Sequence, residues 1–84
     1  MFTYLVYPAA EGWRVQLQDE PQASLLSTFE AAERRARWLA ARASVRGHDS
    51  EILLLAADGA LVGRWQAETY APAPAPAQDR ELAA

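Results

Sequence analysis

Only one segment of this 84-residue chain has the pattern of an amphipathic helix, and strand patterns lie on both sides of it. Over about residues 28–44 every residue is a fair or good helix former. Small or apolar side chains recur there at helical spacing: Phe29, Ala32, Ala36, Leu39, Ala40 and Ala43. Ser27 is an N-cap candidate with Glu30 at the capping-box spacing, and Thr28 competes with it. Gly47 is a natural C-terminal stop. One such narrow stripe can cover only one face of a sheet.

Two strands are expected before the helix. Residues 2–7 are rich in aromatic and β-branched side chains. Residues 12–18 alternate apolar with polar positions, so one face of this strand, with Trp13, Val15 and Leu17, is expected to be buried. A turn over Pro8–Gly12 is expected to join the two segments as a hairpin, and residues 19–27 are expected to form a loop.

Two more strands are expected after it. Residues 52–56 form a continuous apolar run, and Asp58-Gly59 is a strong hairpin signal of the type I′ class. The next strand is expected from residue 61 to between 66 and 68. Gly63 lies inside that strand and indicates a bulge or a close approach of the backbone.

The expected fold is therefore α+β with the element order ββαββ: a four-stranded sheet of two antiparallel hairpins, with one helix packed on one face. Residues 1–70 would form this domain. Residues 71–84 begin with alternating alanine and proline, a pattern that favours polyproline II, so a disordered Pro/Ala tail is expected there.

Composition limits the partners and the setting. The net charge is −3, the chain has no cysteine and one histidine, and all eight basic residues are arginine. A thiolate metal site, a disulfide and a multi-histidine site are excluded. Arginine without lysine, together with abundant alanine, is typical of a GC-rich bacterial genome. No apolar run reaches the ~20 residues of a membrane span and no basic segment opens the chain, so a cytoplasmic location is expected.

Catalytic chemistry has little support in the sequence. His48-Asp49-Ser50-Glu51 is the one stretch that combines acid, base and hydroxyl groups. Four consecutive residues in an extended loop do not converge as a catalytic triad requires. We therefore expect no catalytic, cofactor-binding or metal-binding residues, no cofactor and no small-molecule substrate, and we do not expect an enzyme.

The helical segment is locally basic. Five arginines against two glutamates give it a net charge of +3. Four of the arginines form a candidate basic face: Arg34, Arg35, Arg37 and Arg42. One alternative is ordinary helix stabilisation, because Glu30–Arg34 and Glu33–Arg37 have the favourable i,i+4 spacing. The others are a nucleic-acid contact or a surface for an acidic protein partner.

Apolar side chains exceed what one helix can cover. The strands at 2–7 and 52–56 are apolar on both sides, which is typical of a sheet covered on both faces. The candidate interaction surface consists of Tyr4, Trp38, Leu53, Leu55, Arg64 and Trp65. Scattered exposure is the alternative. Trp38 lies off the helical stripe and could pack at the sheet edge, stack with Arg34 or Arg42, or contact a partner. Arg64 and Trp65 could also offer a platform for base stacking.

Three groups of residues carry a resemblance to a known family. They are Gly12-Trp13, the helix start Thr28-Phe29-Glu30-Ala31-Ala32 with Ala36 and Leu39-Ala40, and Ile52-Leu53-Leu54 followed by Asp58-Gly59. Over residues 3–66 the chain resembles small bacterial domains catalogued as domain of unknown function 2188. It differs from them in a longer, leucine-containing segment before the helix and in Trp38. The resemblance implies the ββαββ fold and no activity, cofactor or catalytic residue.

The function most consistent with these features is a non-catalytic module for self-association or protein interaction, as a homodimer or with an unnamed protein partner. The alternative is a nucleic-acid-binding accessory protein that uses the arginine-rich helix.

Overall fold

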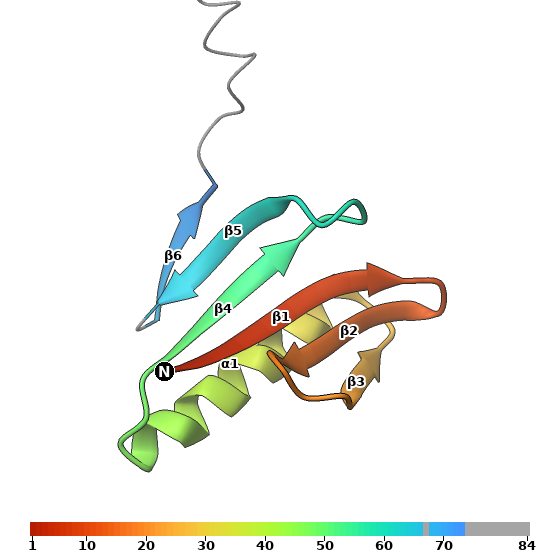
Figure 1. Ribbon diagram of the computed structural model, residues 1–84. Helices are drawn as coiled ribbons and strands as arrows, with labels where there is room; N and C mark the ends of the chain where they lie inside the picture. Colours follow the sequence, from red (N-terminus) through yellow and green to blue (C-terminus); the bar gives the residue numbers. More distant parts are fainter. Residues whose placement is uncertain (67, 74–84) are drawn as a thin grey trace, which may run out of the picture.

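The computed structural model describes residues 1–66 and 68–73, which form one helix and a single six-stranded sheet (Figure 1). In chain order the elements are β1 (Phe2–Ala9), β2 (Gly12–Leu17), β3 (Ala23–Leu26), α1 (Phe29–Val45), β4 (Ser50–Leu55), β5 (Leu61–Gln66) and β6 (Thr69–Pro72). The strands lie in the order β3-β2-β1-β4-β5-β6. The α+β class with one helix is confirmed. The sheet differs from the expected one, since it has six strands instead of four and is mixed instead of antiparallel.

The two central strands, β1 and β4, are parallel, with Tyr4 opposite Ile52 and Val6 opposite Leu54. All other neighbouring strands are antiparallel, including the two expected hairpin pairs β1–β2 and β4–β5. Parallel pairing follows from the crossover: the chain returns along the sheet through a 17-residue helix and starts β4 at the end where β1 also starts.

The edge strands β3 and β6 were not predicted. β3 lies within the expected loop at 19–27 and follows a turn in which Asp19 has a φ of 72°. β6 follows Glu68, whose φ is 66°. Each has only four residues, too few for a period-two pattern to stand out. Residues 71 and 72, assigned above to the tail, are the end of β6, and residues 74–84 of that tail lie outside the described residues.

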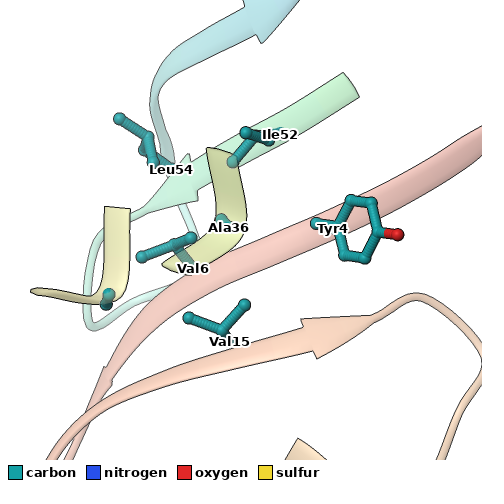
Figure 2. Packing of buried hydrophobic residues seen from close by; sticks show 7 residues of the cluster. Tyr4, Val6, Val15, Ala36, Ile52 and Leu54 are labelled. Carbon is teal, nitrogen blue, oxygen red and sulfur yellow. The ribbon is translucent and has the colours of Figure 1, made fainter. Parts of the chain in front are cut away.

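The core lies between α1 and one face of the sheet. Its buried side chains come from β1, β2, β4 and the helix: Tyr4, Val6, Val15, Ile52, Leu54, Ala32 and Ala36. In Figure 2 the labelled strand side chains lie on the side of the sheet where Ala36 lies. Phe29, Leu39 and Ala40 pack against this core from the helix, so the predicted stripe is confirmed. Its alanines let the helix lie close to the sheet.

Both helix ends are closed by local hydrogen bonds. Thr28, the competing candidate, is the N-cap: its side-chain oxygen accepts a bond of 3.1 Å from the N–H of Ala31. At the other end Gly47 has a φ of 85°. The N–H of Gly47 bonds to the carbonyl of Ser44, and the N–H of His48 bonds to that of Ala43. This is a Schellman motif, so the predicted glycine stop is confirmed.

The β4–β5 hairpin differs from the expected type I′ turn. Only Gly59, with a φ of 88°, has positive φ there, and the N–H of Gly59 bonds to the carbonyl of Ala56. The predicted bulge is present beside Gly63, where the register shifts by one residue between Leu54 and Leu55. The close approach at Gly63 is made by a side chain instead of a backbone, since a Cβ there would collide with the phenol end of Tyr70 on β6.

Candidate interaction surfaces

The face of the sheet opposite α1, here called the open face, is covered by no other element of the described chain (Figure 1). Leu5 of β1 and Leu53 of β4 are direct neighbours at its centre. Leu55 lies two residues further along β4. All three are half-buried between the flanking strands. On β3, Leu25 pairs with Arg14 on this face and is 52% exposed.

Polar side chains flank this apolar centre. Gln16 of β2 and Arg64 of β5 stand on either side of the two central leucines in the same cross-strand row. The Tyr7 hydroxyl donates a hydrogen bond of 2.7 Å to Gln16 Oε1, and the Thr3 hydroxyl donates one of 3.1 Å to Glu51 Oε2. An apolar centre with a polar rim is the usual anatomy of a protein interface.

The six residues predicted as an interaction surface do not lie on one surface. Leu53, Leu55 and Arg64 are on the open face. The prediction for Tyr4 was wrong, since Tyr4 is 7% exposed and belongs to the core. Side chains of β1 alternate between the two faces, and that of Tyr4 points toward α1. For the same reason Trp65 faces α1, so it shares no stacking platform with Arg64.

Trp38 lies on the outer side of α1 and is 46% exposed. The guanidinium carbon of Arg35 is 4.7 Å from its ring centroid, and that of Arg42 is 4.8 Å away. Of the alternatives left open by the sequence, stacking with Arg42 is therefore observed. The second arginine that stacks on Trp38 is Arg35, whereas Arg34 was the one considered from the sequence.

Trp65 is the meeting point of three elements. Its indole N–H donates a hydrogen bond of 3.0 Å to Glu33 Oε2 on α1. The guanidinium carbon of Arg37 lies 4.3 Å from the Trp65 ring centroid, and the Tyr70 ring of β6 lies 5.4 Å away, tilted by 54°. Glu33 and Arg37 are thus both engaged with Trp65. Neither they nor Glu30 with Arg34 form an ion pair in the described chain.

The candidate basic face is therefore divided. Arg35 and Arg42 pack on Trp38, Arg37 packs on Trp65, and Arg34 is exposed beside a groove. Both tryptophan rings are thus already contacted by arginines of the helix.

The groove has a volume of about 890 Å³ and lies between α1 and the end of β5. Ser50 and Ile52 of β4 line its floor, and Ala41 and Ser44 line its helical wall. Trp65 forms part of the opposite wall. Ser50 Oγ is buried and has no hydrogen-bond partner among the described residues.

Of the acid, base and hydroxyl groups at 48–51, those of His48, Asp49 and Ser50 line the groove, whereas Glu51 lies on the other face of the sheet. The His48 ring packs on Phe2, with 4.9 Å between the ring centroids. Ser50 lines the groove on the helix side, whereas Glu51 accepts its hydrogen bond from Thr3 on the open face. Adjacent strand residues face opposite sides of a sheet, which explains the separation of Ser50 from Glu51.

Within residues 1–66 and 68–73, no three His, Asp or Glu side chains lie close enough together to hold a metal ion. The one helix of this part of the chain is not of a length and apolarity that would cross a membrane.

Comparisons with known proteins find no match to this chain among protein families, curated proteins or solved structures. The resemblance to domain of unknown function 2188 is tested by none of them and stays a prediction.

The contacts of Glu33, Tyr70 and Ser50 were not anticipated. Glu33 was considered for an ion pair within the helix, and Tyr70 was the last residue of the expected domain, beyond the end of its last expected strand. The one available signal was the Thr69-Tyr70 pair, two good strand formers that begin two residues after the end of β5. The isolation of Ser50 Oγ leaves no mark on the sequence.

Proposed function

We propose that this chain is a non-catalytic interaction module that self-associates through the open face of its sheet. The observation that carries the proposal is the Leu5–Leu53 pair, which lies at the centre of a face that no described element covers. Central strands with apolar side chains on both faces are typical of sheets that are covered on both sides. A second copy would supply the missing cover. A bacterial, cytoplasmic setting is part of this proposal and rests on composition.

The size of the face sets the expected strength of the contact. Six strands about 4.8 Å apart, each about six residues long, present roughly 500 Å². A two-fold contact would then bury about 1,000 Å² in total, near the lower limit for a specific interface. The open face carries charges of both signs, from Arg14, Arg64 and Glu51. Two copies can therefore meet with opposite charges facing each other. We expect a dimer with a dissociation constant in the micromolar range.

Sedimentation equilibrium from about 1 µM to about 1 mM tests this proposal. We expect a monomer–dimer equilibrium that Leu53→Thr shifts strongly toward monomer. Val45→Thr is the matched control, because Val45 is 89% exposed on the helix, away from the open face. Urea unfolding of each variant separates loss of association from loss of folding. A wild-type chain that stays monomeric at about 1 mM contradicts the proposal.

The alternative is a nucleic-acid-binding accessory protein. What supports it is that the helix arginines have no carboxylate partner among the described residues, where the one ion pair is Arg14–Glu11 at 3.5 Å. The acidic net charge and the arginines already stacked on both tryptophans favour the first proposal. A gel-shift assay at two salt concentrations tests the alternative, since phosphate contacts strengthen as salt falls.

A further inference from the structure

The helix lies off-centre on the sheet. It packs against β1, β2, β3 and β4, and its backbone does not approach β5 or β6 (Figure 1). On the helix side, the half of the sheet toward β6 is therefore incompletely covered, and the groove of about 890 Å³ lies there. This volume falls within the range of ligand-binding clefts, which is about 300–1,000 Å³.

Small side chains keep this groove open. The wall formed by α1 has Ala40, Ala41 and Ser44 where larger residues would reach toward β5. Ala41 is exposed, so the space beside it is open to a partner. Below this wall, Ile52 is apolar, and Trp65 closes the far side. A large apolar side chain entering beside Ala41 would replace water on these surfaces.

The groove is cationic on its helical wall. Arg34 and Arg37 line it, and no carboxylate in the described chain forms an ion pair with either. Glu33, the nearest acidic residue in sequence, accepts the hydrogen bond from Trp65. At the other end of the groove lie Asp49 and Glu68. A phosphate backbone running along the groove would meet these two carboxylates, whereas a short segment with a carboxylate at one end would not.

We propose that this groove binds a short acidic segment of another protein, with a large apolar side chain beside Ala41 and a carboxylate on Arg34. The acidic turn at Asp19 and Glu20 of a second copy does not meet this description, because the nearby Leu17 packs against the core of its own copy. The helix of a second copy does not fit the groove either, because its arginines would face the arginines of the groove.

Selection from a random-peptide display library against the immobilised full chain tests this proposal. We expect enrichment of peptides in which Asp or Glu lies close to Leu, Phe or Trp. A fluorescein-labelled copy of the most enriched peptide is then titrated with each variant by fluorescence anisotropy. Ala41→Trp fills the groove and Arg34→Glu reverses its charge, and each should weaken binding by at least about tenfold.

Two control variants carry the same kinds of change outside the groove. Val45→Trp adds an indole at an exposed helix position, and Arg46→Glu reverses a charge near the end of the helix. Both should bind like the wild type. Leu53→Thr, which disrupts the proposed dimer, should also bind normally, so the two proposals can fail separately.

Three results would overturn the proposal. One is a library that enriches no common sequence. Another is an enriched set that binds the Ala41→Trp variant as tightly as the wild type. The third is binding of a labelled oligo-dT strand that depends on Arg34 and is competed by salt, which would assign the surface to nucleic acid instead.

Discussion

The indole N–H of Trp65 and the Glu33 carboxylate are joined by a hydrogen bond of 3.0 Å, which connects β5 to a helix whose backbone does not approach that strand. Arg37, one turn further along α1, covers the ring of the same tryptophan. Two helix residues with the spacing of an intrahelical ion pair are thus both used in a tertiary contact. This contact also forms one wall of the groove beside α1.

Removing the donor should measure the strength of this contact. Trp65→Phe keeps an aromatic ring for Arg37 and loses the N–H, so we expect a loss of about 1–2 kcal/mol in the free energy of unfolding. In a double-mutant cycle with Glu33→Ala, the coupling energy from urea unfolding should be about 1 kcal/mol. The same cycle with Glu30→Ala should give none. Equal values for the two cycles would show that the hydrogen bond contributes nothing.

The identity of the N-cap predicts a difference between two neighbouring residues. Thr28→Ala removes the side-chain acceptor for the N–H of Ala31 and should lower stability by about 1 kcal/mol. Ser27→Ala should change it by no more than a few tenths of a kcal/mol. Thermal unfolding followed by circular dichroism gives both values. A larger effect at Ser27 would place the cap one residue earlier.

Adjacent leucines on β4 should respond differently to truncation. Leu54 is 2% exposed in the core, so Leu54→Ala should cost about 2–4 kcal/mol through lost burial and a residual cavity. Leu53 is half-buried on the open face, where Leu53→Ala should cost less than about 1 kcal/mol in the monomer. Urea unfolding at low protein concentration is the measurement. Similar losses at both positions would mean that the open face is covered.

The close approach of β5 and β6 should make two substitutions interdependent. Gly63→Ala places a methyl group against the Tyr70 phenol and should lower stability by about 1 kcal/mol as the ring moves off Trp65. In a Tyr70→Ala background the same change should be nearly neutral. Additive losses in urea unfolding would show that Gly63 is required for another reason.

The predicted interaction surface was only partly assembled correctly from sequence. Leu53, Leu55 and Arg64 share the open face because alternation along a strand determines which side each residue takes. Tyr4 was included since its strand is apolar on both sides, and apolar residues alone do not tell which side faces the helix. Trp65 alternates with Arg64 along β5 and therefore lies on the helix side. Trp38 lies on the outer side of α1, where Arg35 and Arg42 pack on its ring.

Short-range chemistry was sufficient for α1, for its glycine stop and for the four longer strands, and it left the N-cap open between Ser27 and Thr28. A cap, a helical repeat, a glycine stop and a strand alternation each act within a few residues, so they are visible in the sequence. Four features were not visible in the sequence: the strand order, the parallel β1–β4 pair, the edge strands β3 and β6, and the off-centre position of the helix. They depend on where a 17-residue helix lets the chain return and on backbone pairing between residues distant in sequence. The groove beside α1 is a consequence of that placement.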